Sequence, residues 1–210
     1  MSFTDATYFR GELAIAGLSS APVTENLGFF ITKYETEFLN KVLGYAFAKL
    51  FLDGLAVVAP ATPDQRWLDL RNGKAYTYQN VDGVWMGFQN ASKQSPLANL
   101  IYYHYLRDQI SQTVGVGQAQ TNAENATIVS PAHKLMRAFN EMVDMQVSLV
   151  SYLLANADIY PEFKFEAGDL WALNYWQWNN YWLNFGYWPW DYMWQMCPNR
   201  LYKRINTFNI

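Results

Sequence analysis

Two histidines and one cysteine are the residues best suited to chemistry in this chain of 210 residues. His104 falls in one predicted helix and His133 in the first turn of another, so the two could meet in space. Nothing at a recognisable spacing supplies a third metal ligand, which makes structural or exposed roles the simpler interpretation. Cys197 precedes a proline and has no histidine near it in sequence, which argues against a nucleophile. An enzyme that uses His104 and His133 remains a minor alternative.

Carboxylates and glycines give no stronger signal for catalysis. Gly115-Val116-Gly117 lacks the third glycine of a dinucleotide-binding turn, and no convincing strand precedes it. Four carboxylates fall on predicted helices, where such side chains usually form a solvated face: Glu35, Glu37, Glu141 and Asp144. We therefore expect no catalytic, cofactor or metal site, and a protein that is not an enzyme.

The composition indicates a surface that is partly covered by other chains. Charged residues make up 16% of the sequence, against roughly 25% in a typical soluble domain, while 51% are hydrophobic. The net charge of −3 argues against a nucleic-acid-binding face. No apolar run approaches the roughly 18 residues of a membrane span, and no signal peptide is visible, so we expect a soluble protein.

Hydrophobic periodicity and capping residues predict four main helices. The first covers residues 24–43 with Thr24 as its N-cap, and a second covers 45–53 and ends at Gly54. The third runs from Ser95-Pro96 to about residue 113 and is apolar nearly all round, which is typical of a central helix. The fourth runs from Ser130-Pro131 to about residue 156.

Shorter elements connect these helices. Thr62 is predicted to cap a short helix that Asn72-Gly73 closes. Residues 75–78 and 84–86 predict a β-hairpin whose turn contains Asp82-Gly83. Residues 118–127 are small and polar, and we expect them to form a long loop.

These elements predict a mainly α fold: a helical bundle of about four long helices, with a small β-hairpin insertion and a Trp-rich C-terminal extension. Residues 1–23 are expected to be a loose N-terminal arm with a possible short helix over 7–13, or simply a disordered tail. Residues 24–165 form the bundle in this division, and residues 166–210 form the extension.

The extension is unusually aromatic. Twelve of the 24 residues from 171 to 194 are aromatic, seven of them tryptophans, and Asp191 is the lone charge. Burying seven tryptophans would remove about 1,400 Å² from water, worth on the order of 35 kcal/mol. A soluble monomer rarely exposes so much apolar surface, so another surface must cover these rings.

Three kinds of surface could bury the aromatic segment. It could fold back onto its own bundle as core, dock as an arm on a neighbouring subunit, or serve as a platform on which sugar rings stack. Part of it has helical spacing, from a cap at Asp169 to Gly186. The residues predicted to form a protein interface are Trp171, Tyr175, Trp178, Trp182, Phe185, Trp188, Trp190 and Trp194. The short basic stretch that follows, with Arg200, Lys203 and Arg204, is expected to be a solvated tail, or else to contact an acidic patch on a partner.

Several short motifs suggest a family. They are Tyr34-Glu35, Glu37-Phe38-Leu39, Val42-Leu43-Gly44-Tyr45, Gly54-Leu55, Arg66-Trp67, Trp85-Met86-Gly87-Phe88, Ser95-Pro96-Leu97-Ala98-Asn99, Tyr102-Tyr103, Gly115-Val116-Gly117, Ala123-Glu124-Asn125-Ala126 and Asn140-Glu141-Met142-Val143. In these, the chain resembles the head-to-tail connector (neck or adaptor ring) proteins of tailed phages that infect Bacteroidetes, of the crAss-like type. The resemblance covers roughly residues 24–165, leaves out the Trp-rich extension, and rests on packing motifs.

The resemblance implies a structural virion protein. Such adaptors form a ring, typically of about twelve copies, below the portal protein. The ring extends the DNA channel and docks the tail and other neck proteins, while DNA passes without specific binding and no membrane is involved. The location would be the virion, assembled in the host cytoplasm. The alternative from a different class is a carbohydrate- or ligand-binding module that uses the Trp-rich C-terminus.

Overall fold

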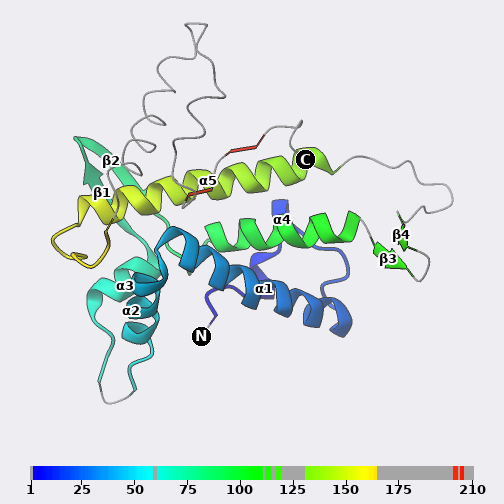
Figure 1. Cartoon of the computed structure of the whole chain (residues 1–210), viewed down its shortest axis with the longest axis horizontal. Helices are drawn as coiled ribbons and strands as arrows, with labels where there is room; N and C mark the ends of the chain where they lie inside the picture. The colour runs from blue at the N-terminus through cyan, green and yellow to red at the C-terminus, as the bar shows by residue number, and fades with distance from the viewer. Residues whose placement is uncertain are drawn as a thin grey trace, which may run out of the picture.

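The structure is a computed structural model that describes residues 2–58, 61–110, 112–114, 117–119, 131–164, 201–202 and 204–205. Within these residues the order of elements is α1 (Ala21–Val42), α2 (Tyr45–Leu55), α3 (Gln65–Asn72), β1 (Lys74–Tyr78), β2 (Val81–Trp85), α4 (Pro96–Ile110), β3 (Gln112–Val114), β4 (Gly117–Ala119) and α5 (Ala132–Ala155). The predicted mainly helical class is confirmed (Figure 1). Of the Trp-rich extension, residues 166–210, the structure describes only 201, 202, 204 and 205, and the remaining residues lie outside the described ones.

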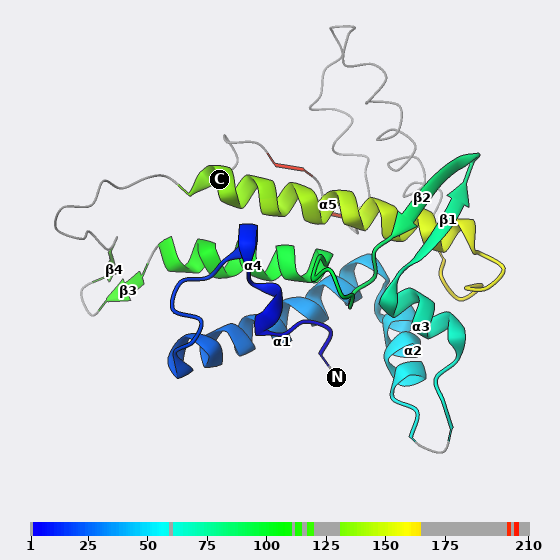
Figure 2. The same cartoon turned by 180° about the vertical axis from the view of Figure 1, so that it is seen from behind.

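Helix α4 occupies the centre, as its sequence predicts. It packs between α1 and α5, and Figures 1 and 2 show the three helices in adjacent layers. Leu97, Leu100 and Ile101 are completely buried, and Tyr102 and Tyr105 are nearly so. A helix with apolar residues on most sides needs partners on both faces, and α1 and α5 supply them.

Helix α1 begins three residues earlier than predicted. Its first residue is Ala21, with Ser20 at the N-cap position and Pro22 in the first turn. Proline suits this position because its fixed φ is helical and its missing N–H is not needed there. Thr24 is therefore inside the helix, and its hydroxyl donates to the carbonyl of Leu18 at 2.8 Å.

Helix α2 continues through Gly54, so the predicted stop at that glycine is wrong. A Cβ atom at Gly54 would overlap the indole of Trp67, which is 5% exposed. The glycine therefore permits close packing of α3 on α2 and does not end the helix. Helix α3 is capped by Asp64 and not by Thr62, because the Asp64 carboxylate accepts from the N–H of Arg66 at 3.2 Å. Gly73 closes α3 at φ +96°, as expected.

The first hairpin exists, but its turn is not where the sequence placed it. Tyr78 pairs with Val81, so the loop is Gln79-Asn80, and both residues have positive φ (51° and 63°). Two consecutive left-handed residues make the turn type that matches strand twist, and asparagine tolerates that conformation. Gly83 lies within β2 opposite Tyr76, whose ring would be 2.6 Å from an added Cβ. The glycine thus makes room for an aromatic ring.

Helix α4 ends at Ile110, before the predicted residue 113. Residues 112–114 instead pair with residues 117–119 as the antiparallel hairpin β3–β4. The predicted loop therefore begins with strand residues, and its part from 120 to 127 lies outside the described residues. The start of α5 at Ala132, just after Pro131, agrees with the sequence, as does its end near residue 156.

The N-terminal segment is packed, so the expectation of a loose or disordered arm is wrong for residues 2–20. Two single 3₁₀ turns, Ala6–Tyr8 and Gly11–Leu13, stand where a short helix was considered. Phe3, Tyr8 and Phe9 are each 2% exposed and belong to the core. Phe3, Tyr8 and Phe9 follow neither the two-residue repeat of a strand nor the three-to-four-residue repeat of a helix. The sequence alone therefore resembled a loose arm.

Glu35 holds this segment in place, which corrects its assignment to a solvated face. Its carboxylate is 6% exposed and accepts from the N–H groups of Thr4 (2.7 Å) and Phe3 (3.2 Å). The hydroxyls of Thr4 and Ser2 add bonds of 2.6 and 3.0 Å. A buried carboxylate is tolerated where several donors satisfy it.

Candidate interaction surfaces

All eight aromatic residues predicted to form an interface fall within residues 171–194, which lie outside the described residues. The candidate surfaces below therefore come from the parts of the chain that the structure describes. They were not singled out by the sequence, because exposure of an apolar residue depends on tertiary packing.

Helix α2 has one buried apolar face, and its exposed side carries two apolar residues beside the Lys49–Asp53 ion pair. Phe47 and Phe51 lie in the core, at 3% and 0% exposure, because they point toward α3 and the segment after α5. Tyr45 and Leu50 are exposed on the same helix. The residues that follow the helix continue this apolar surface, and Val58 is 80% exposed.

Exposed apolar side chains are concentrated at one end of the molecule. Of the eight exposed large hydrophobic side chains in the described residues, only Phe29 lies on another element; the other seven are Tyr45, Leu50, Val57, Val58, Val81, Val84 and Ile159. They belong to α2, to the residues after it, to β2 and to the residues after α5. Both views place these elements at the same end of the molecule, away from β3–β4, with the β1–β2 hairpin on one side of that end and α2 on the other (Figures 1 and 2). We call the surface formed by these seven residues the apolar end.

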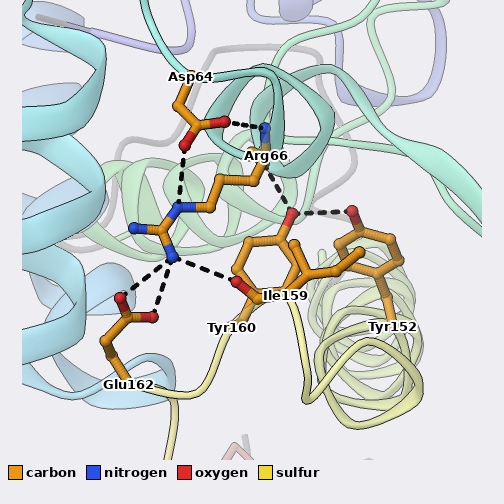
Figure 3. A network of polar contacts seen from close by, with 6 residues as sticks. All are labelled: Asp64, Arg66, Tyr152, Ile159, Tyr160 and Glu162. Atoms are coloured by element: carbon orange, nitrogen blue, oxygen red, sulfur yellow. Dashed lines mark hydrogen bonds and ion pairs between the residues drawn. The ribbon is translucent and has the colours of Figure 1, made fainter.

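A polar network joins α3 to the residues after α5 at the apolar end (Figure 3). The guanidinium of Arg66 donates to the carbonyl of Ile159 (3.2 Å) and to the carboxylate of Glu162 (3.1 Å). In return, the hydroxyl of Tyr160 donates to the backbone carbonyl of Arg66 at 2.7 Å, and it also lies 2.9 Å from the hydroxyl of Tyr152. Burial raises the pKa of Tyr160, so this phenol stays protonated and remains a donor.

This network joins segments that are distant in sequence. Arg66 lies in the first turn of α3, whereas Ile159 and Glu162 follow α5, so one side chain connects residues more than ninety positions apart. The Arg66 guanidinium also lies 4.2 Å from the ring centre of Trp67. A preorganised surface loses little conformational entropy when a partner binds.

A second candidate is an open pocket of about 520 Å³ between α1 and α4, lined by Phe29, Phe30, Lys33, Tyr34, His104, Arg107 and Asp108. The His104 ring stacks on Tyr34 with centroids 3.8 Å apart. Burial, reinforced by the positive charges of Arg107 and Lys33, lowers the pKa of His104 to about 4. His104 is therefore neutral at pH 7 and packs as an aromatic ring.

The chemistry considered for the two histidines finds no support in this geometry. His133 is exposed in the first turn of α5, whereas His104 stacks on Tyr34 and meets the Tyr103 ring edge-on. Across the described ranges, no three histidine, cysteine or acidic side chains are placed to hold a metal ion. No helix in the described part of the chain is long and apolar enough to cross a membrane. A scan against known protein-family models, a search of curated proteins and a search of solved structures each found no match to this chain.

Proposed function

We propose that this chain is a structural subunit that assembles with copies of itself into a ring. Its role would be that of a head-to-tail adaptor below the portal of a tailed phage, which extends the DNA channel and docks the tail. The observation that carries self-assembly is the apolar end, where seven of the eight exposed large hydrophobic side chains in the described residues lie, and where Arg66 joins α3 to the segment after α5. Exposed apolar side chains that gather on one part of a surface are typical of protein–protein contacts.

A ring requires two different surfaces on each subunit. The apolar end is one. The aromatic segment of residues 171–194 is the second in this proposal, because aromatic side chains carry much of the binding energy at interfaces. Successive copies would then meet head to tail, with the aromatic segment of one copy against the apolar end of the next.

The adaptor assignment within this class rests on the sequence resemblance over residues 24–165. The near-neutral net charge supports it, because a strongly basic channel wall would hold DNA through its phosphates. The portal protein and other neck or tail proteins would be the neighbours, and the assembled virion the location.

The test is the mass of the purified protein by light scattering over a concentration series, with negative-stain images of the same samples. We expect closed rings. Replacing Tyr45 and Val58 by serine should weaken assembly at least tenfold without loss of stability, because both side chains are exposed in the monomer, at 71% and 80%. A Lys134→Ala control, at an exposed position of α5 outside the apolar end, should assemble normally. A monomer of 24.3 kDa at every concentration would contradict the proposal.

A second set of variants tests the aromatic segment. Replacing Trp178, Trp182 and Trp188 by alanine should leave the helical signal in circular dichroism unchanged and abolish the rings. Full rings from this variant would exclude the segment as the second surface. Titration with a panel of soluble sugars, followed by tryptophan fluorescence, tests the ligand-binding alternative in the same samples.

A further inference from the structure

Residues 201, 202, 204 and 205, near the C-terminus, lie on the protein like a bound peptide. The expected solvated tail is wrong for the described residues here, because Tyr202 is only 9% exposed and Leu201 and Ile205 pack against the core. Figure 1 shows this segment, in red, beside α5. We call the residues that hold it the tail-binding surface: Glu37, Phe38 and Lys41 of α1 and Phe139, Asn140, Asp144 and Gln146 of α5.

Two side-chain amides bind the backbone of the tail. Gln146 donates to the carbonyl of Tyr202 at 3.1 Å and accepts from its N–H at 2.9 Å. Asn140 does the same for Ile205, with distances of 3.1 and 2.9 Å. Each amide thus satisfies both backbone groups of one residue, as a neighbouring strand would, so an extended segment is held without a sheet.

Tyr202 is the anchor that gives this contact its selectivity. Its ring stacks on Phe38 (centroids 5.9 Å apart) and meets Phe139 edge-on (6.0 Å), and the Lys41 ammonium lies 4.0 Å from its centre. The hydroxyl donates to Glu37 at 3.2 Å. Burial, followed by the negative charge of Glu37, raises the pKa of Tyr202 and keeps this donor protonated. A phenylalanine would leave Glu37 without this bond.

A charged contact completes the recognition. The Arg204 guanidinium forms an ion pair with the Asp144 carboxylate on the exposed face of α5. The tail-binding surface therefore binds an aromatic hydroxyl, a cation two positions later and an apolar residue after that. It also binds the backbone N–H and carbonyl groups of two residues. These features define a site for a Tyr-x-Arg-Ile peptide.

We infer that, in the assembled protein, the tail-binding surface is occupied by residues 202–205 of a neighbouring copy. The peptide site is seen directly; its occupation by another copy rests on the self-assembly proposed above. Exchange of a terminal segment between identical subunits makes the same contacts in both arrangements, so it costs no contact energy. The aromatic segment lies between the core and this tail in sequence, and its burial between copies would favour exchange.

The length of the intervening chain permits exchange. Residues 165–200, which number 36, separate the described core from the tail. Fully extended, 36 residues would span at most about 120 Å. A compact domain of this size has a radius of gyration of about 17 Å, so a neighbour in contact lies within reach.

The inference is tested by cross-linking full-length chains in which Cys197 is replaced by serine. One chain carries Asp144→Cys and a second, with a different tag, carries Arg204→Cys; the two are co-expressed. Because arginine is long, the two Cβ atoms need not be within disulfide range, so a short bismaleimide is used. We expect a covalent heterodimer at several times the yield of a matched control in which Asp53→Cys replaces Asp144→Cys. Asp53 is also an ion-paired helical aspartate, and its side chain is 62% exposed against 50% for Asp144.

Two further variants show whether the heterodimer depends on recognition. Tyr202→Ala in the Arg204→Cys chain, or Gln146→Ala in the Asp144→Cys chain, should each reduce the heterodimer to the control yield. Circular dichroism checks that both remain folded, and because they lie on opposite partners, a folding failure of one leaves the other as the test. A heterodimer yield at the control level overturns the inference, as does a chain with both cysteines that gives only cross-linked monomer.

The two proposals fail separately. Closed rings in which cross-linking is confined to single chains would reject tail exchange and leave the adaptor role standing. Heterodimers without closed rings would support tail exchange and reject the adaptor ring.

Discussion

Replacing Glu35 by alanine should detach the N-terminal segment and destabilise the whole protein. The carboxylate accepts four hydrogen bonds from Ser2, Phe3 and Thr4, with distances of 2.6–3.2 Å, and only 6% of the residue is exposed. Hydrogen bonds to a charged acceptor contribute about 1.5–3 kcal/mol each. Their sum overstates the loss, because the freed segment can leave the core and bond to water.

Detaching the N-terminal segment exposes buried aromatic side chains, and this sets a lower limit on the loss of stability. Phe3 stacks on Phe51 with ring centroids 5.6 Å apart, and Tyr8 and Phe9 are buried beside it. Exposing an aromatic side chain of this kind costs roughly 1.5–3 kcal/mol. We therefore expect Glu35→Ala to lower the free energy of unfolding by about 3–5 kcal/mol, a large part of a typical stability of about 5–15 kcal/mol.

Urea unfolding followed by circular dichroism measures this loss, and trypsin cleavage at Arg10 reports the segment locally. Glu35→Gln keeps one acceptor oxygen and should lose about half as much. Glu25→Ala, an exposed glutamate of the same helix, should change stability by no more than about 0.5 kcal/mol. If Glu35→Ala behaved like Glu25→Ala and cleavage at Arg10 did not accelerate, the role assigned to this carboxylate would be refuted.

Three other predictions follow from the packing. The folded pKa of His104 is about 4, below its ordinary 6.5, so the unfolded chain binds more protons and stability should fall as the pH drops from about 6.5 to 4. Because His104 is partly exposed, we expect this loss of stability to be about 1–2 kcal/mol. The loss is measured as the difference between urea midpoints at pH 7 and 4.5, and His104→Phe should abolish that difference. A variant with an unchanged pH dependence would contradict the prediction. Gly54→Ala should cost about 1–3 kcal/mol in thermal unfolding despite better helix propensity, because Trp67 has no room to move; a stabilised variant would contradict the close packing. Gln79→Gly should raise stability by about 0.5–1 kcal/mol, since Gln79 has φ 51° in the two-residue turn with Asn80; a decrease would place the turn elsewhere.

The local elements were largely predictable, whereas their boundaries were not. The apolar faces of α1, α4 and α5 repeat every three to four residues, so their existence followed from the sequence. Glycines misled the prediction twice: Gly54 and Gly83 were assigned to a helix end and a turn, yet both make room for an aromatic ring from a distant position. The sequence alone does not distinguish a glycine that is needed for a positive backbone φ from one that is needed for its small size.

The candidate surfaces were the least predictable part. The sequence predicted an interface at residues 171–194. The described part of the structure instead indicated two other surfaces, the apolar end and the tail-binding surface. Nothing in the pattern of Tyr45 or Val58 marks them as exposed, because exposure depends on which face of α2 packs against α3. Asn140 and Gln146 look like ordinary polar positions of α5 until the tail lies across them.

The sequence by itself determined the helical class, the central place of α4, the hairpin after α3 and the amount of apolar surface that must be covered. These follow from composition and from periodicities within one element, which involve neighbours three or four residues apart. The tertiary structure decided that Glu35 is buried, that the N-terminal segment and the tail residues Leu201, Tyr202 and Ile205 pack on the core, and that exposed apolar side chains gather at one end. Each of these depends on contacts between residues from about thirty to more than ninety positions apart, and no local pattern encodes such pairs.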